Sequence, residues 1–122
     1  MEKLEKTIRY TKLFNIYKSQ LSMSQQDIIN NYFFLDLSLS EIASEKGISR
    51  SAVEDALQKG MAKLDELEKD MRILEKSEKI QQKLDKLREK ALNITEIEEI
   101  EDIRKELDNG IWSINWQIIP NI

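Results

Sequence analysis

Residues 38–59 contain two helix starts separated by one glycine, and this spacing limits the fold more than any other feature of the sequence. Ser38 and Glu41 stand at the spacing of a capping box, which predicts the start of a short helix. Gly47 can adopt the positive φ that a sharp turn requires, so the helix is expected to end there. Ser49 is then in position to cap a following helix. The segment therefore predicts a helix-turn-helix.

The apolar residues of this segment indicate how its two helices pack together. Small Ala43 allows the helices to cross closely, and Gly47 makes the turn between them. The other apolar residues are expected to fill the wedge between the helices: Ile42, Ile48, Val53 and Leu57. Because folds are reused for many functions, a helical hairpin of this kind can also serve only as a core, and this alternative stays open.

The opposite face of the second helix is a candidate surface for DNA. In a DNA-binding unit this helix enters the major groove and presents side chains to base edges and phosphates. The candidate residues are Ser49, Arg50, Ser51, Glu54, Asp55, Gln58 and Lys59. Arg50 is the best candidate for a contact with guanine or the backbone, and the helix start can hold a phosphate. The face as a whole is neutral, because Glu54 and Asp55 balance the two cations; they would repel the duplex, although an acidic side chain can accept a bond from cytosine.

Two helices are expected before this segment. Residues 2–21 place apolar side chains at helical spacing with lysines between them, which is typical of an amphipathic helix. Ser24 is expected to cap the second helix, ahead of Ile28 and Ile29. The apolar face of this second helix should meet the first helix.

The chain after the motif continues the helical pattern in two seams. The first seam is Val53, Leu57, Met61, Leu64, Leu67, Met71 and Leu74, and the second is Ile80, Leu84, Leu87, Ala91 and Ile94. The seams are out of phase across polar residues 75–79, so a kink, stutter or loop is expected there. Thr95 and Glu98 form another capping-box signature, which predicts a last helix that ends at Asn109 and Gly110.

The segment from 111 to 119 is unusually apolar. Its large side chains are Ile111, Trp112, Ile114, Trp116, Ile118 and Ile119. These are too many exposed large residues for a free tail, so the segment is expected to dock on something. Alternation at positions 112, 114, 116 and 118 fits a strand, whereas 112, 116 and 119 fit a helix, and both readings stay open.

The fold class that follows is all-α: a helical bundle with a wingless helix-turn-helix, plus a long helical C-terminal extension. Residues 1–72 are expected to form the helix-turn-helix domain, and residues 73–122 the extension with its Trp-rich tail. The first seam can pack on the helix of residues 2–21 or on the same seam of a second copy. The surplus of apolar helical surface favours a homodimer, which would present two recognition helices.

Composition excludes several classes of function. The sequence has no Cys and no His, which removes disulfides, thiolate nucleophiles and most zinc sites. Because it also lacks a phosphate loop and a carboxylate cage, we expect no enzyme, no metal and no cofactor. No apolar run approaches the roughly 20 residues that span a bilayer, and no targeting pattern opens the chain, so a cytoplasmic protein is expected.

The charge balance limits how DNA could be bound. The net charge is −4, and basic residues are outnumbered by acidic ones in both parts, 11 against 12 in residues 1–72 and 8 against 11 in residues 73–122. Neutralisation of phosphates supplies most non-specific affinity for nucleic acid. A tight, indiscriminate DNA binder is therefore disfavoured, and DNA affinity is expected to be weak to moderate.

The motif residues resemble a known family. Leu37-Ser38-Leu39-Ser40-Glu41-Ile42-Ala43 followed by Gly47-Ile48-Ser49-Arg50-Ser51-Ala52-Val53 is similar to the promoter-reading fourth region of bacterial sigma factors, and more closely to the YlxM family of small helix-turn-helix proteins. Arg9 and Leu13-Phe14-Asn15-Ile16-Tyr17 also resemble that family's opening helix. The resemblance covers residues 6–67. It implies a bacterial cytoplasmic protein with a regulatory role in the signal recognition particle pathway.

Two functions remain in view. The leading hypothesis is a DNA-binding helix-turn-helix regulator of transcription that takes part in the signal recognition particle pathway. The alternative is a protein or ribonucleoprotein adaptor that uses the same fold to bind a targeting component without binding DNA.

Overall fold

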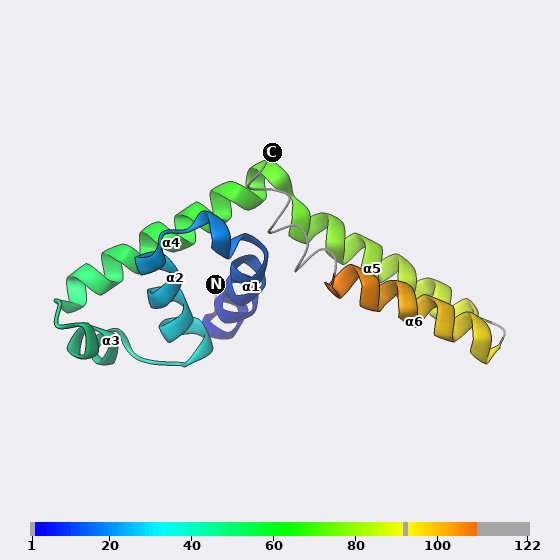
Figure 1. Ribbon diagram of the computed structural model, residues 1–122, viewed down its shortest axis with the longest axis horizontal. Coiled ribbons are helices and arrows are strands. Elements are labelled where there is room, and N and C mark those ends of the chain that lie inside the picture. The colour runs from blue at the N-terminus through cyan, green and yellow to red at the C-terminus, as the bar shows by residue number, and fades with distance from the viewer. Residues whose placement is uncertain (1, 92, 110–122) are drawn as a thin grey trace. The chain divides into compact units, whose positions relative to one another are not determined.

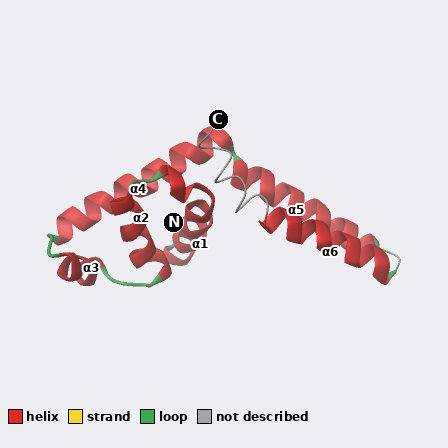
Figure 2. Ribbon diagram, in the orientation of Figure 1, coloured by secondary structure: helices red, strands yellow, loops and turns green. Residues whose placement is uncertain are grey.

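The computed structural model describes residues 2–91 and 93–109, and this part of the chain is helical without any strand (Figures 1 and 2). The six α-helices are α1 (Lys3–Tyr17), α2 (Met23–Ile29), α3 (Leu39–Lys46), α4 (Arg50–Met71), α5 (Ile73–Lys90) and α6 (Ile94–Asn109). A 3-10 turn, η1 (Lys18–Gln20), follows α1, and a π-helical turn, η2 (Asn30–Phe34), follows α2. The predicted all-α fold is confirmed. No helix among these residues is long and apolar enough to cross a membrane.

Helix α2 begins two residues earlier than predicted. The prediction that Ser24 caps this helix is wrong, because the cap is Ser22. The Ser22 hydroxyl accepts a hydrogen bond from the Gln25 N–H at 3.1 Å, and the Gln25 side-chain oxygen accepts one from the Ser22 N–H at 3.0 Å. This reciprocal pair satisfies two backbone donors at once, which gives Ser22 the advantage over Ser24.

Helix α6 shows the same displacement. Its cap is not the predicted Thr95, which lies in the first turn, but Asn93. The Asn93 side-chain oxygen accepts a hydrogen bond from the Glu96 N–H at 2.9 Å, as a short polar side chain does at a helix start. The expected stop at Gly110 and the apolar segment 111–119 lie outside the described residues.

The break after the first seam also differs from the prediction. It consists of one residue, Arg72, whose φ of 56° is left-handed and separates α4 from α5. Residues 75–79, where the interruption was expected, lie inside α5. Four of these residues are exposed, while Ser77 is buried at 4%. On the exposed side, Glu75 pairs with Arg72 at 3.1 Å and with Lys79 at 3.4 Å.

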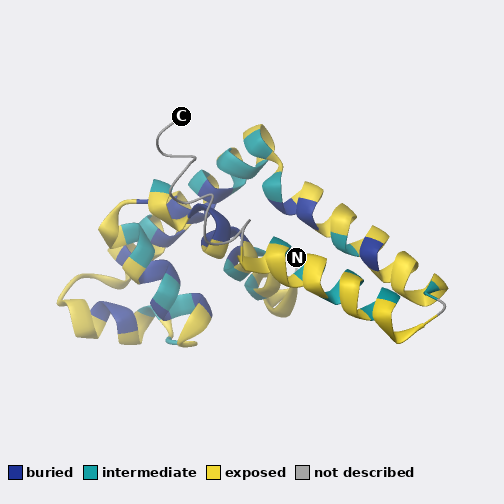
Figure 3. Ribbon diagram, turned by 45° about the vertical axis from the view of Figure 1, so that its right-hand side comes forward, coloured by how far each residue is buried: buried dark blue, intermediate teal, exposed yellow. Residues whose placement is uncertain are grey.

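The chain divides at this break into two compact units. We call the part up to Met71 the N-terminal unit and the part from Arg72 onward, built on α5 and α6, the hairpin unit. In the N-terminal unit, α1, α2 and α3 all pack on α4 and bury its apolar side (Figure 3). The seam residues buried there are Val53, Leu57, Met61 and Leu64. This part of the first seam is thus occupied within the chain.

A glycine allows the closest approach in the N-terminal unit. A Cβ at Gly60 of α4 would lie 2.8 Å from Cδ1 of Ile29, a side chain of α2 with no exposed surface. Such a contact is too short for two carbon atoms, so a side chain at position 60 would force the buried Ile29 side chain to shift. Gly60 therefore leaves room for Ile29 where α2 packs on α4.

The hairpin unit consists of two antiparallel helices that lie side by side (Figure 1). Polar contacts join them, and the partner positions fall along α5 as they rise along α6. Arg88 pairs with Glu101 at 3.4 Å, Asp85 with Arg104, and Gln81 with Asp108 at 3.5 Å. The hydrogen bond and charge of Asp85 raise the pKa of Arg104. Leu84 of α5 is buried, at 5% exposure.

Candidate nucleic-acid interface

Local capping builds the turn between α3 and α4 as the sequence predicts. The Ser38 hydroxyl accepts from the Glu41 N–H at 3.1 Å, and the Glu41 carboxylate accepts from the Ser38 N–H at 3.2 Å. Gly47 ends α3 in the left-handed conformation, with φ 66° and ψ 32°. The Ser49 hydroxyl then accepts from the Ala52 N–H at 3.0 Å and starts α4. Both helix starts and the turn are therefore specified locally.

The wedge between the two helices is filled by most of the residues proposed for it. Four are buried, with exposures of 7% or less: Ile42, Ala43, Val53 and Leu57. Ile48 differs, because its side chain is 44% exposed and lies at the surface of the turn instead of in the wedge. Its backbone N–H donates to the Ala43 carbonyl at 3.1 Å, which closes the turn after α3.

All seven candidate DNA-contact residues are exposed. They lie at the cap and in the first ten residues of α4: Ser49, Arg50, Ser51, Glu54, Asp55, Gln58 and Lys59. Val53 and Leu57, on the same turns, are buried, so this half of the helix has one face in the core and one in solvent. The structure thus brings the predicted residues together on one surface.

The electrostatics of this surface are close to neutral. Lys59 and Asp55 form an ion pair at 3.0 Å one turn apart, and both side chains are more than half exposed. An exposed pair of this kind contributes only about 0.3–0.5 kcal/mol to stability. It does, however, neutralise the positive charge of Lys59 with the negative charge of Asp55. Nearby, Lys46 of α3 is paired with Asp27 of α2. Arg50 and Glu54 are the remaining charges among the candidates.

Helix α3 adds acidic side chains to the same unit. Glu41 and Glu45 line an open hollow of about 320 Å³ together with Leu37 and Ser44. Glu41 already accepts the capping hydrogen bond from Ser38. The exposed side of α3 therefore carries carboxylates that do not favour a phosphate backbone.

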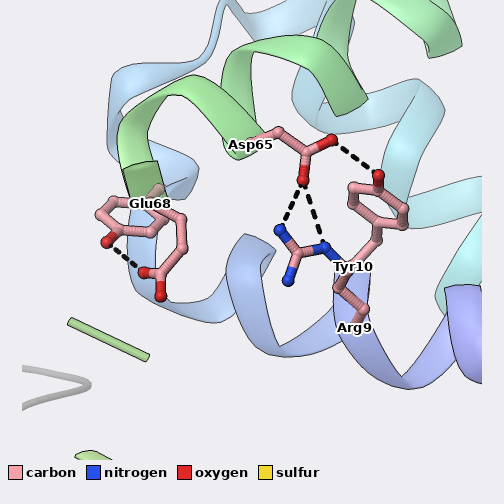
Figure 4. Close-up of polar contacts among 5 residues, drawn as sticks. Arg9, Tyr10, Asp65 and Glu68 are labelled. Carbon is pink, nitrogen blue, oxygen red and sulfur yellow. Dashed lines mark hydrogen bonds and ion pairs between the residues drawn. The ribbon is translucent and has the colours of Figure 1, made fainter. Parts of the chain in front are cut away.

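A polar cluster in the second half of α4 joins this helix to α1, and sequence reasoning did not predict it (Figure 4). Arg9 donates to one Asp65 oxygen from Nη2 at 2.7 Å and from Nε at 3.2 Å, while the Tyr10 hydroxyl donates to the other oxygen at 2.7 Å. Further along, the Tyr17 hydroxyl donates to Glu68 at 2.7 Å. These contacts join residues 51 to 56 positions apart, so no local pattern could reveal them.

The environment of this cluster shifts two pKa values. Burial, together with the hydrogen bond to Asp65, raises the pKa of Tyr10. Burial alone would lower the pKa of Arg9, but the hydrogen bond and charge of Asp65 outweigh it and raise the pKa overall. Both side chains keep their protons at neutral pH, so both can donate hydrogen bonds to the Asp65 carboxylate.

Comparisons with known proteins agree with this geometry. A family model described as "Putative helix-turn-helix protein, YlxM / p13 like" matches residues 4–104. A UPF0122 protein of Shouchella clausii is 39% identical over 95 residues, which cover 78% of this chain and 87% of the relative. UPF0122 protein YlxM of Bacillus subtilis is 36% identical over 105 residues, covering 86% and 96%. The family match also continues past residues 6–67, where the motif resemblance ends, and includes most of α6.

Proposed function

Because the chain belongs to the YlxM/p13-like family of helix-turn-helix proteins, we propose that it is a DNA-binding regulatory protein that reads its target with the exposed face of α4. The observation that supports this proposal is that the first turns of α4 have one buried face and one exposed face. Val53 and Leu57 hold the helix in the core, while the seven candidate side chains project into solvent from a capped helix end. This is how a recognition helix is presented to the major groove.

The candidate residues have distinct roles in this proposal. Arg50, in the first turn, is suited to the paired acceptors of guanine or to a phosphate, and Gln58 to the paired groups of adenine. Ser49 and Ser51 stand beside the first free N–H groups of the helix, which favour an anion. Glu54 can accept from the amino group of cytosine. The surface thus combines readout of bases with few contacts to phosphate.

This charge pattern determines the kind of binding that is expected. With two cations against two acids on the face, few counterions are released, so affinity is modest and its salt dependence is shallow. Selectivity then depends on base contacts and on two copies acting together. A homodimer would place two recognition helices on a symmetric site. We further propose, from the motif resemblance, that this regulation takes place in the cytoplasm and serves the signal recognition particle pathway.

The test is selection of bound fragments from a genomic DNA library by the purified protein at near-physiological salt. Enrichment of one motif is the expected result, and a two-fold symmetric motif would support the dimer. Arg50→Ala should weaken binding to that motif by about 1–3 kcal/mol if the contact is to guanine. The matched control is Lys69→Ala, about 28 Å along α4 at about 1.5 Å per residue. If Arg50→Ala and Lys69→Ala bind the motif with equal affinity, Arg50 does not contact the DNA. If no DNA fragment is enriched, the DNA-binding proposal is wrong.

A second function is favoured by the neutral face itself. The adaptor hypothesis uses the same unit to bind a protein or ribonucleoprotein of the targeting machinery without DNA. The carboxylates of Glu41 and Glu45 and the 44% exposed Ile48 fit a mixed polar and apolar contact better than a phosphate backbone. Purified signal recognition particle components should then bind the protein. This binding should be insensitive to Arg50→Ala but weakened by Ile48→Glu or by substitution of Trp112.

A further inference from the structure

The outer side of α1 carries large apolar side chains that the described residues leave exposed. The buried residues of this helix face the core of the N-terminal unit: Tyr10, Leu13, Phe14, Ile16 and Tyr17. Leu4 and Ile8 lie on the other side of the helix, one turn apart, and are 70% and 47% exposed. Two apolar side chains at this spacing form the beginning of a stripe along the helix.

Two threonines extend this stripe as an apolar surface. Thr7 and Thr11 stand three and seven residues after Leu4, on the same side of α1. The Thr7 hydroxyl donates to the Lys3 carbonyl at 3.0 Å, and the Thr11 hydroxyl donates to the Thr7 carbonyl at 2.7 Å. Because both hydroxyls are satisfied within the helix, covering them would leave no donor without a partner. We call the stripe of Leu4, Thr7, Ile8 and Thr11 the outer face of α1.

The end of η2 widens this face. Phe34 and Leu35 are 41% and 57% exposed, and the centroid of the Phe34 ring lies 5.4 Å from that of Phe14 in α1. Lys3 pairs with Asp36 at 3.7 Å, which holds the segment after η2 beside the first turn of α1. Phe34 and Leu35 therefore lie along one edge of the outer face.

Exposed apolar side chains of the N-terminal unit gather at this place. In the part of this unit that the structure describes, the other large apolar side chains at the surface are Met23 and Ile48. A cluster of this kind marks an interaction surface, whereas single exposed side chains do not. The first seam is buried within the chain from Val53 to Leu64, so a homodimer needs another contact. The outer face of α1 can provide it.

The order of side chains along the outer face fits a second copy that runs in the opposite direction. The large Leu4 and Ile8 lie toward its first half, and the small Thr11 lies in its second half. When two copies cross antiparallel near Ile8, Leu4 of each copy lies against Thr11 of the other, so large side chains pack on small ones. Glu5 and Lys12 follow one edge of the face, and the same crossing brings each carboxylate near the ammonium group of the other copy. A parallel pair would instead place Glu5 next to Glu5.

The size of the face indicates the strength of the contact. Helix α1 has 15 residues, which give it a length of about 22 Å. One pair of helices of this length, with Phe34 and Leu35 at the edge, lies near the lower limit of about 1,200 Å² for a specific interface. The expected contact is therefore a reversible dimer whose population depends on protein concentration.

We propose that the outer face of α1 is the homodimer interface of this protein, with α1 of two copies packed antiparallel about a two-fold axis near Ile8. This inference rests on the homodimer of the proposed function, but it does not depend on DNA binding. Because each side chain occurs twice in a two-fold contact, one substitution changes the interface at two places.

Sedimentation equilibrium of the full-length chain over a range of concentrations tests the proposal. The wild type should show a reversible equilibrium between monomer and dimer. Ile8→Glu places two like charges beside the axis and should raise the dissociation constant of the dimer by about a hundredfold or more. The matched control is Met23→Glu, at an apolar position of α2 that is 79% exposed, and it should keep the wild-type constant. Circular dichroism, and unfolding at concentrations where the chain is monomeric, should agree among all three proteins, because both positions are exposed.

Cross-linking tests the direction of the two helices, because the sequence contains no Cys. A mixture of Leu4→Cys and Thr11→Cys chains should form a disulfide-linked heterodimer under mild oxidation, since the antiparallel contact sets these positions opposite each other. Leu4→Cys alone should form few linked dimers, and efficient linking would mean a parallel pair and overturn the proposed arrangement.

Two results would contradict the proposal outright. If the wild type is monomeric at every concentration, the outer face is covered by something other than a second copy. If the wild type forms a dimer that Ile8→Glu leaves unchanged, the copies meet at a different surface. Failure to enrich a DNA motif would instead contradict DNA binding and leave these measurements unaffected.

Discussion

The two units are both built from helices, but they differ in how many apolar side chains those helices bury. In the N-terminal unit, three helices converge on α4, and side chains such as Leu13, Ile16 and Leu64 have no exposed surface. In the hairpin unit, Leu74 and Leu84 are buried and polar contacts join α5 to α6, while Leu87 and Ile103 remain about half exposed. A close-packed core therefore supports the candidate interface, whereas the described helices of the hairpin unit bury few apolar side chains.

The comparison predicts its largest effect in the core of the N-terminal unit. Leu64→Ala should lower the free energy of unfolding by about 2–5 kcal/mol, because it leaves a cavity at a fully buried position of α4. Leu4→Ala, at a position 70% exposed, should change it by about 0.5 kcal/mol or less. Denaturant unfolding measures both values, and amide exchange should show loss of protection in α1–α4 with little change in α5 and α6. Equal loss of protection in both units would break the distinction between them.

The next effect tests the close approach of α2 to α4. Gly60→Leu should destabilise the N-terminal unit by about 1–3 kcal/mol, because the new side chain overlaps buried Ile29. The control is Ala62→Leu, two residues further along α4 at an exposed position. Thermal unfolding of the two variants should differ clearly. If Gly60→Leu unfolds no earlier than Ala62→Leu, the helices are not packed at the distance that the structure gives.

The polar cluster at Asp65 predicts a smaller effect with a pH dependence. Tyr10→Phe removes one hydrogen bond and should reduce stability at pH 7 by about 0.5–1.5 kcal/mol. Because the folded state raises the pKa of Tyr10, the unfolded state loses this proton first as pH rises. The contribution of Tyr10 is thus complete below the unfolded pKa of about 10 and is lost progressively as pH rises from there through the higher folded pKa. Unfolding of wild type and Tyr10→Phe between pH 8 and about 11 should converge, and a constant difference would contradict this role.

The contrast also explains which features could be predicted from sequence. The turn at Gly47 and the exposed face of α4 depend on residues within a few positions of each other, so spacing was sufficient to predict them. The cluster of Arg9, Tyr10 and Asp65 joins distant positions, and Asp65 belongs to a charge-rich stretch that is also typical of a solvated face. Such pairs become visible only when the helices are packed.

Helix boundaries were predicted less well, for two physical reasons. At α2 and α6, two polar residues compete for the cap, and the earlier one, Ser22 or Asn93, accepts the hydrogen bond. At the end of α4, the break falls on Arg72, a residue that rarely adopts a positive φ and gives no glycine signal. The polarity of residues 75–79 did not locate the break, because a polar stretch is equally compatible with a continuous exposed helix.

The smallest expected effect lies in the polar contacts of the hairpin unit. Arg88→Gln removes the ion pair with Glu101, whose partners are 55% and 34% exposed, and should reduce stability by about 0.2–1 kcal/mol. Salt at 1 M shortens the screening length to about 3 Å, so the difference between wild type and variant should shrink further. Amide exchange in α5 and α6 at low and high salt measures this locally. A loss as large as that of Leu64→Ala would mean that ion pairs, and not apolar packing, determine the stability of the hairpin unit. Retention of α5 and α6 protection at high salt would instead assign that stability to apolar packing, as in the N-terminal unit.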